Sequence, residues 1–193
     1  IDFEKIEKLA NISSEDLFDK NKINLLAVGR LSHQKGFDTL IEILKELDNK
    51  YCLTILGLGP DEEKLKSMIK ELNLESKVKL LGFKDNPYIY MKQADIFVLS
   101  SRFEGFPNVV LEANACQTPV VAFDCPGGTE EIIINGENGY LAKCQNKKDF
   151  ISKIDSIDLN KKIDKKILIK YEVSQIVNSY EILFENTLKE KNK

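Results

Sequence analysis

Tryptophan is absent from the 193 residues and histidine occurs once, at His33, so chemistry that depends on imidazole has little to draw on. One imidazole gives no basis for a histidine-based zinc site or for a nucleophile paired with a histidine base. A basic surface is also missing, because 28 lysine and arginine residues stand against 31 acidic residues and the formal net charge is −3. Without a basic tract interleaved with aromatic residues, we expect no nucleic-acid partner.

Long apolar runs are missing as well. None reaches the length that spans a bilayer, and residues 1–20 contain neither a basic leader region nor an apolar one. We therefore expect a soluble protein that resides in the cytoplasm.

The four cysteines form no C-x-x-C pair, and three of them lie in or beside apolar runs. Reduced thiols in the core of a cytosolic protein have this distribution. We therefore expect Cys52, Cys116, Cys125 and Cys144 to be buried thiols, and to form neither a disulfide nor a metal site.

From residue 23 onward, apolar runs alternate with amphipathic stretches, as strands and helices do in an α/β protein. The strands are nearly continuously apolar, which indicates burial on both faces. We expect a Rossmann-like parallel sheet of about six strands with helices on both faces. The expected strands are 23–29, 51–57, 77–82, 95–100, 118–123 and 139–142, and the expected helices are 36–47, 61–73, 86–93 and 107–116.

The two ends of the chain differ from its middle. Residues 1–20 carry scattered charge and no strand pattern, so we expect either a linker or a segment that leads into the sheet domain, residues 21–170. Residues 171–193 are expected to form a C-terminal helix, and six apolar residues share one face of it: Ile176, Val177, Tyr180, Leu183, Phe184 and Leu188. That face needs a cover, either from this domain or from another domain outside the sequence.

Loops that follow the strands are the informative places, because ligands of such sheets bind beyond the carboxyl ends of the strands. After the first strand, Gly29 permits a close turn, Arg30 offers a planar fork of donors and Lys35 adds a second cation. A helix begins directly afterwards, and its free N–H groups favour an anion. The loop is therefore a candidate diphosphate site, although the sequence lacks both G-x-x-x-x-G-K-[ST] and G-x-G-x-x-G. The alternative is two surface cations beside a turn.

Weaker signals follow the second and third strands. Gly57, in the sequence GLGP, would let a ligand approach the backbone, but such a sequence also ends strands that bind nothing. Phe83 offers a stacking surface for a nucleobase, and core packing is the alternative.

After the fourth strand, Glu104 lies in a loop and Glu112 lies in a helix that opens at Pro107 and is apolar on nearly every side. A carboxylate on such a helix needs hydrogen-bond donors, which either Arg30 or sugar hydroxyls of a ligand would supply. After the fifth strand, Gly127 and Gly128 form a flexible turn, and Thr129 is the expected N-cap of a short helix. Loops from four strands thus offer groups for anions or hydroxyls around one crevice.

These residues resemble the C-terminal, nucleotide-sugar-binding half of a retaining GT-B glycosyltransferase of family 4, the glycogen-synthase-like group. The resemblance rests on VGRLSHQKGFDTLI (28–41), GLGP, LGF, the long segment 94–133 and NGENGYL (135–141). Within 94–133, Glu104 and Glu112 form the E-x7-E motif. The chain departs from the family at Gln117, where glycine is usual before Thr-Pro-Val, so the turn there is expected to differ slightly.

The resemblance implies a role for each candidate residue. Arg30 and Lys35 would bind the donor diphosphate, Glu104 would contact the donor sugar, and Glu112 would hold the ribose hydroxyls. The remaining positions would line the donor pocket: Gly29, Gly57, Phe83, Gly105, Phe106, Pro107, Asn108 and Val109. Arg30, Lys35 and Glu104 form the expected catalytic set, and no metal is expected, which agrees with the absence of an Asp-x-Asp sequence.

The implied function is transfer of a hexosyl group from a nucleoside-diphosphate sugar, with a UDP-sugar favoured, to an acceptor hydroxyl with retention of configuration. The implied partner is an N-terminal acceptor-binding domain outside this sequence, and the implied setting is polysaccharide or glycolipid synthesis with peripheral membrane association. Residues 1–20 would then be a post-linker segment. Three alternatives remain open: a non-catalytic nucleotide-sugar-binding module, another GT-B enzyme such as an epimerase or phosphorylase, and a Rossmann oxidoreductase.

Overall fold

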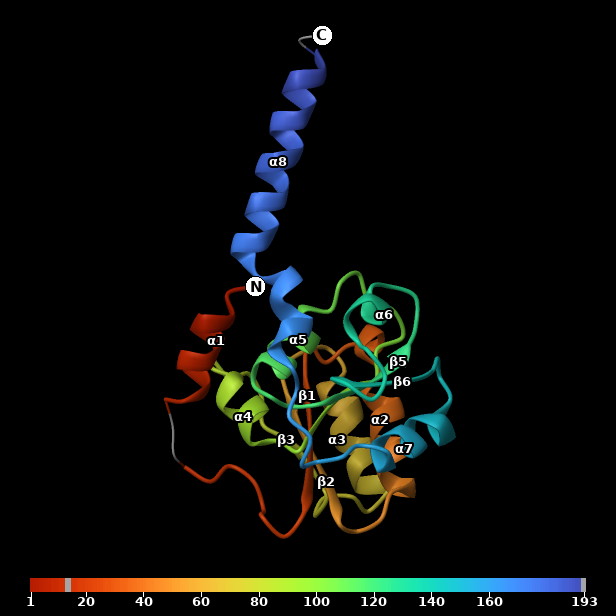
Figure 1. Ribbon diagram of the computed structural model, residues 1–193. Helices are drawn as coiled ribbons and strands as arrows, with labels where there is room; N and C mark the ends of the chain where they lie inside the picture. Colours follow the sequence, from red (N-terminus) through yellow and green to blue (C-terminus); the bar gives the residue numbers. More distant parts are fainter. Residues whose placement is uncertain (13–14, 192–193) are drawn as a thin grey trace.

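The computed structural model describes residues 1–12 and 15–191, which form a six-stranded parallel sheet with helices on both faces (Figure 1). The strand order is β3-β2-β1-β4-β5-β6, and all neighbouring strands pair in parallel. This order is that of a Rossmann-like sheet and confirms the expected fold class. The strands are β1 Ile23–Val28, β2 Tyr51–Leu56, β3 Val78–Leu80, β4 Ile96–Leu99, β5 Val120–Asp124 and β6 Gly139–Lys143.

Two separate apolar cores cover the two faces of the sheet. Alternate residues of one strand enter different cores, as Leu25 and Leu26 of β1 do, because successive side chains of a strand point to opposite faces. One core receives α2 (Phe37–Glu46), α3 (Glu62–Glu71) and α7 (Lys147–Asp155). The other receives α1 (Phe3–Ala10), α4 (Tyr88–Gln93), α5 (Asn108–Ala115) and the 3-10 helix η2 (Lys165–Tyr171).

Helix α1 lies within the segment that was expected to be a linker or to lead into the sheet domain. Its residues Ile6 and Ala10 are buried against the core that also contains residues of α4 and α5, and the Asp2 side chain caps the helix by accepting from the Lys5 amide. The helix has only eight residues, and two buried positions among charged neighbours give too weak a period to identify it in advance.

Helix starts differ from expectation at two places. Pro107 is the N-cap of α5 rather than a residue of its first turn. Thr129 is the first residue of α6 (Thr129–Ile132), and Gly128 holds the N-cap position that was expected for Thr129. Thr129 is buried, so its side chain is turned into the domain instead of standing free at the helix end.

Most of the C-terminal segment forms helix α8 (Val173–Lys191), which projects away from the sheet domain (Figure 1); residues 192–193 of the expected helix lie outside the described residues. The described part of the domain does not cover its apolar side chains, which remain between 38% and 62% exposed: Val173, Ile176, Val177, Tyr180, Ile182, Leu183, Phe184 and Leu188. Across the described residues, no helix combines the length and the apolar character that crossing a membrane requires.

The expectation of four free thiols is wrong for two of them, because Cys125 and Cys144 form a disulfide. Their strands explain the pairing. Asp124 of β5 lies opposite Lys143 of β6, so the next residue of each strand is also brought to its neighbour, with a Cα–Cα distance of 4.9 Å. The two cysteines are 19 residues apart in the sequence, and the register of β5 and β6 brings them together. Their spacing alone does not indicate this pairing. Cys52 and Cys116 are free.

The disulfide predicts a redox-dependent stability. Closing a loop of this length restricts the unfolded chain and contributes on the order of 3 kcal/mol. We expect the double variant Cys125→Ser/Cys144→Ser to lose about this free energy of unfolding in urea titrations under oxidising conditions, and Cys52→Ser to lose much less. A reductant should bring the wild-type chain to the level of the double variant, and a wild-type curve that ignores the reductant would contradict the prediction.

Candidate functional site

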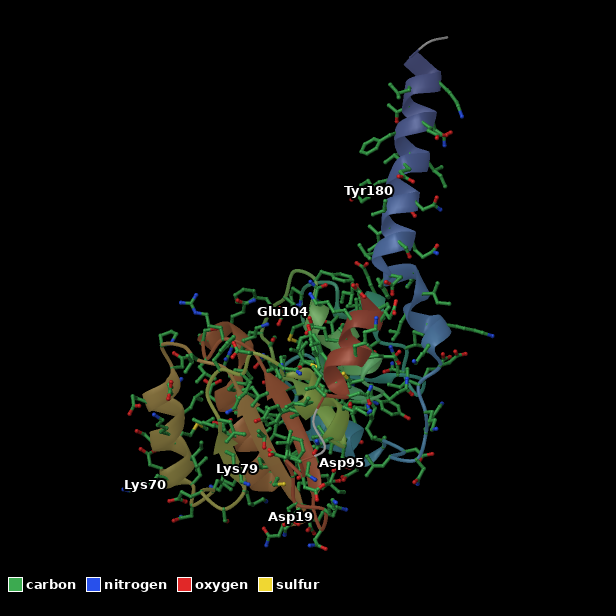
Figure 2. The ribbon with its side chains drawn as sticks, turned by 90° about the vertical axis from the view of Figure 1, so that its left-hand side faces the viewer. Asp19, Lys70, Lys79, Asp95, Glu104 and Tyr180 are labelled. Atoms are coloured by element: carbon green, nitrogen blue, oxygen red, sulfur yellow. A yellow bond between two sulfur atoms is a disulfide. The ribbon has the colours of Figure 1, made fainter. Side chains whose placement is uncertain are left out.

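The loops after β1, β3, β4 and β5 meet at the carboxyl edge of the sheet, because the strands are all parallel. Figure 2 shows Glu104 at this edge, the same end of the domain from which α8 projects, and Asp19 and Lys79 at the opposite end. The candidate residues in these loops therefore lie at this edge of the sheet.

An ion pair between Lys35 and Glu104 joins two of these loops. Lys35 Nζ lies 2.6 Å from Glu104 Oε1, and the side chains are only 18% and 9% exposed. Ser101 Oγ donates to the same carboxylate oxygen at 2.5 Å. Gly29 makes room for this arrangement, because a Cβ at that position would come within 3.2 Å of Lys35 Cε. The loop after β1 thus supplies an ammonium group that pairs with the carboxylate in the loop after β4.

Arg102, which the sequence analysis did not single out, holds the loop that contains Lys35. Its Nη1 and Nη2 donate to Asp38 Oδ1 and Oδ2 at 3.0 and 3.2 Å, and Nη1 also donates to the His33 carbonyl at 2.6 Å. Burial alone raises the pKa of Asp38, but hydrogen bonds from Arg102, the Thr39 amide and Lys64 outweigh it and lower the pKa to about 2. Asp38 is therefore ionised at neutral pH.

The backbones of the two loops also lock together. The Arg102 amide donates to the Gln34 carbonyl at 2.8 Å, and Ser100 Oγ donates to the Lys35 carbonyl at 2.9 Å. Gly36 has a φ of 64°, and a Cβ there would lie 2.2 Å from the Ser100 carbonyl oxygen. Only glycine permits this approach, so the sequence Lys35-Gly36 sets the position of the ammonium group.

The loop after β5 supports the Glu104 loop from its other side. The Glu104 amide donates to the Pro126 carbonyl at 3.0 Å, and the Gly128 amide donates to the Gly105 carbonyl at 2.8 Å. A Cβ at Gly127 would lie 2.0 Å from the Glu104 carbonyl oxygen. The glycine pair that the sequence marked as a flexible turn is thus packed directly against residues 104–105.

A cavity of about 430 Å³ lies beside the ion pair and gathers four of the predicted residues. Phe83 at its rim is 66% exposed and is therefore not part of the core. Gly57 also has a structural role, because a Cβ at this position would lie 1.9 Å from the Gly29 carbonyl oxygen. The cavity is lined by Val28, Gly29, Arg30, Leu56, Gly57, Leu58, Phe83, Lys84, Asp85 and Pro87.

Glu112 is on α5, and its neighbour is Tyr88 at the start of α4. Burial raises the pKa of the Glu112 carboxyl, and a hydrogen bond with the Tyr88 side chain acts against this shift. Arg30, the protein partner expected for Glu112, lines the cavity instead. Tyr88 occupies the first position of a helix and carried no motif that would have revealed this contact.

Gln117 ends α5 in the left-handed region, with a φ of 67°. This conformation is the one that glycine adopts at the end of a helix, and Gln117 occupies the position where glycine is usual. Its side chain offsets the cost with two contacts to Ile163: Nε2 donates to the carbonyl at 3.3 Å, and Oε1 accepts from the amide at 3.2 Å. Gln117 thus adopts a left-handed turn at the far end of α5 from Glu104, and whether this turn differs from that of the family stays a prediction.

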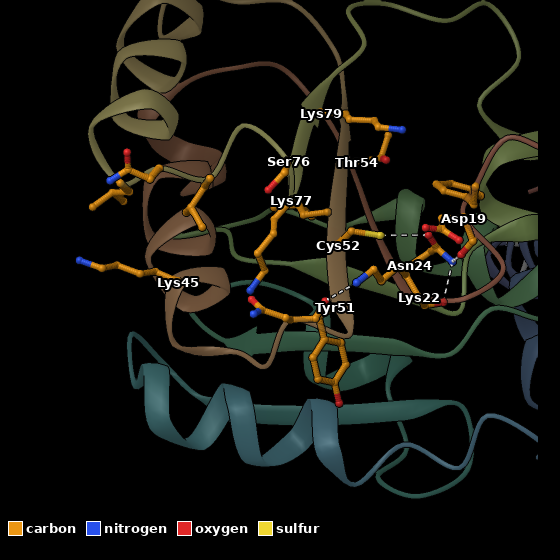
Figure 3. A pocket seen from close by; sticks show the side chains of 16 residues that line it. Asp19, Lys22, Asn24, Lys45, Tyr51, Cys52, Thr54, Ser76, Lys77 and Lys79 are labelled. Atoms are coloured by element: carbon orange, nitrogen blue, oxygen red, sulfur yellow. Dashed lines mark hydrogen bonds between the residues drawn. The ribbon is translucent and has the colours of Figure 1, made fainter.

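A larger cavity of about 600 Å³ lies at the opposite edge of the sheet and contains none of the predicted residues (Figure 3). Several of its polar groups form hydrogen bonds between neighbouring elements of the domain. Lys77 Nζ donates to the carbonyls of Leu44 and Leu47 at 3.2 and 2.9 Å, and Cys52 Sγ donates to Asn24 Oδ1 at 3.1 Å. Within the described ranges, no group of three or more His, Cys, Asp or Glu side chains is arranged to hold a metal ion.

The Arg102–Asp38 contact predicts a pH-dependent loss of stability. Because the pKa of Asp38 is lower in the folded chain than its ordinary 3.8, the stabilisation is present above that value and is lost as the pH falls toward 2. We expect Arg102→Ala to lower the free energy of unfolding by about 2 kcal/mol at pH 7. The difference from wild type should shrink between pH 4 and pH 2, whereas Lys70→Ala, an exposed control, should differ from wild type at neither pH. Urea titrations across this range measure it, and a constant gap between the two chains would contradict the role of Asp38.

Glu112 predicts a dependence of the opposite sign. Its pKa is raised by burial, so the folded chain binds the proton more tightly than the unfolded chain does. The stabilisation of the folded chain that comes from protonated Glu112 is present at acid pH, and it is lost as the pH rises through the range in which carboxyl groups ionise. Glu112→Gln should remove it, so unfolding free energies of variant and wild type should converge toward low pH. Glu75→Gln, at an exposed position, provides the matched control, and an identical pH profile for Glu112→Gln and wild type would count against the burial of this charge.

Comparison with known proteins identifies the family of this chain. The family described as Glycosyl transferases group 1 matches residues 10–172. An N-acetylgalactosamine-N,N'-diacetylbacillosaminyl-diphospho-undecaprenol 4-alpha-N-acetylgalactosaminyltransferase of Campylobacter jejuni is 41% identical over 141 residues, which cover 73% of this chain and 38% of that protein.

Two solved structures give the same result. The lipopolysaccharide outer core galactosyltransferase WaaB is 26% identical with a TM-score of 0.78, over 89% of this chain and 51% of that one. TarM of S. aureus, solved with fondaparinux, alpha-GlcNAc-glycerol and UDP, is 28% identical with a TM-score of 0.78, over 90% of this chain and 38% of that one. The chain spans less than half the length of the curated relatives it matches. The chain belongs to the group 1 glycosyl transferases, and its sheet is that of the GT-B glycosyltransferases.

Proposed function

We propose that the chain is the donor-binding half of a retaining glycosyltransferase of family 4. It would bind a nucleoside-diphosphate sugar, with a UDP-sugar favoured, and the whole enzyme would transfer the hexosyl group to an acceptor hydroxyl with retention of configuration. The observation that carries this proposal is the shielded Lys35–Glu104 pair beside a cavity of about 430 Å³ at the carboxyl edge of the sheet. Polysaccharide or glycolipid synthesis is the proposed setting, as in several named relatives.

The cavity suits the nucleoside part of such a donor. Phe83 presents an exposed ring at one rim, and Gly29 and Gly57 are among the residues that line the cavity. Glu112 would accept hydrogen bonds from the ribose hydroxyls, with Tyr88 keeping the carboxylate in place. The UDP held by TarM supports uridine as the nucleoside.

The diphosphate would lie between the cavity and the ion pair. Arg30 has an exposed guanidinium at the cavity, and the Lys35 ammonium has three N–H donors, so it can contact an oxygen of the donor while still bound to Glu104. Gly105, Phe106, Pro107, Asn108 and Val109, at and just before the start of α5, would surround the phosphates and the sugar. These cations would stabilise the charge that grows on the diphosphate as the sugar leaves.

Glu104 would orient the sugar rather than attack it. Its Oε1 already accepts from Lys35 and Ser101, which holds the carboxylate in one place and leaves the other oxygen for sugar hydroxyls. Holding the donor sugar in a fixed position supplies rate acceleration without a covalent bond to the protein. Retention would then follow from attack on the same face of the sugar through an oxocarbenium-like state.

The remainder of the enzyme would bring the acceptor. We assign residues 1–20 to the segment after an interdomain linker, residues 21–170 to the donor-binding domain, and residues 171–193 to a helix that packs toward an N-terminal domain. The exposed apolar side chains of α8 support this assignment. The chain alone would bind the donor without transferring it, and the whole enzyme would act in the cytoplasm, at times associated peripherally with the membrane.

Calorimetric titration of the chain with UDP tests the proposal. We expect wild-type binding, and a loss of affinity of at least about tenfold in Lys35→Ala and Arg30→Ala, because each removes a charged hydrogen bond to phosphate. Lys70→Ala, an exposed lysine away from this edge (Figure 2), should bind as wild type does.

Two results would count against the proposal. Unchanged UDP affinity in both variants would exclude the diphosphate assignment, and wild-type binding to neither UDP, GDP nor ADP would exclude the donor class. A whole enzyme that binds the donor but neither hydrolyses nor transfers it would favour the alternative, a non-catalytic nucleotide-sugar-binding module.

A further inference from the structure

Two segments that lead into and out of the domain are bonded to each other at the base of α8. The Ile1 nitrogen donates to the Tyr171 carbonyl at 2.8 Å, and the Val173 amide donates to the Ile1 carbonyl at 3.0 Å. The Phe3 amide also lies 3.4 Å from Glu172 Oε2. Figure 1 shows this junction, residues 1–3 with residues 171–173, where α8 leaves the domain. The junction therefore ties the base of α8 to the start of the described chain.

The side chain of Tyr171 connects the junction to both loops of the candidate site. Its ring centroid lies 5.8 Å from that of Phe106, at an interplanar angle of 52°. Its hydroxyl donates to the carbonyl of Glu131 in α6. The Phe106 ring also lies close to Gly128, because a Cβ there would lie 2.9 Å from a ring carbon. Phe106 thus contacts both Tyr171 and the loop after β5.

Phe106 is two residues from Glu104 in the chain. The loop between them is bonded to the same neighbour, since Gly105 accepts from the Gly128 amide at 2.8 Å. A displacement of the Tyr171 ring would therefore act on the backbone that positions the Glu104 carboxylate. An aromatic pair of this geometry contributes through ring contact beyond simple burial, which makes the ring the part of Tyr171 that matters most here.

We propose that Tyr171 is a positioning residue for donor binding, which couples the junction at the base of α8 to the loop 104–108. This inference rests on the proposed donor site and adds a residue to it that neither touches the cavity nor belongs to the motifs. Tyr171 keeps the loop in its binding geometry before the donor arrives, so the ordering cost of binding is reduced. Through the same contact, the arrangement of α8 sets how well the donor is held.

Three variants of the chain test the inference. Tyr171→Ala removes the ring and the hydroxyl, and Tyr171→Phe removes only the hydroxyl. Tyr180→Ala is the matched control, because Tyr180 is exposed on α8 and its ring contacts Phe184 rather than a site loop. The readouts are the calorimetric affinity for UDP, and the hydrogen exchange of peptides covering residues 104–108 and 127–132 without ligand.

We expect Tyr171→Ala to bind UDP about two- to tenfold more weakly, and to exchange faster in both peptides while the rest of the sheet is unchanged. Tyr171→Phe should stay within about twofold of wild type, and Tyr180→Ala should match it in both readouts. Wild-type affinity in Tyr171→Ala overturns the inference, as does exchange that is unchanged or that increases evenly over the whole chain. If the wild-type chain binds no nucleoside diphosphate, the proposed function fails, and the exchange measurement still decides whether Tyr171 positions the loop.

Discussion

Lys35 and Glu104 form an ion pair at 2.6 Å in a place where little water reaches either side chain, and the rest of the site is organised around that contact. Charges shielded in this way are stable only when both partners are held in register, because an unpaired one would be costly. The loop after β1 must therefore keep its position relative to the loop after β4. Arg102, Gly36 and Ser100 supply this through direct contacts between the two loops.

The parallel sheet makes this arrangement possible. Strands β1, β4 and β5 are neighbours, so their three loops emerge side by side although they are far apart in the chain. Each loop contributes a different group. The loop after β1 supplies an ammonium group, and the loop after β4 supplies a carboxylate. The loop after β5 supplies a glycine turn that packs against the loop after β4. Family membership makes this edge the candidate functional site, and the contacts between its loops explain how the edge is held together.

Expectation and structure agree where a local pattern was long and regular. The six strands, helices α2 to α5 and helix α8 lie where the apolar periods predicted them. They differ where a contact depends on distant elements. The Cys125–Cys144 disulfide follows from the register of β5 and β6, and α1 follows from packing on α4 and α5. No motif indicates the roles of Arg102, Tyr88 and Tyr171, because their partners come close only after folding: Asp38 is 64 positions from Arg102, and Glu131 is 40 positions from Tyr171.

The sequence by itself determined the class of sheet and the charged residues that follow its strands, and it predicted the edge at which a ligand would bind. Apolar runs and glycines act through the local backbone, and this information is contained in short segments. Only the tertiary structure decided which partners those charges have: Ser101 and Lys35 for Glu104, Tyr88 for Glu112, and Asp38 for Arg102. The reason is that a partner is selected by distance in space, which strand order and loop packing set and residue order does not.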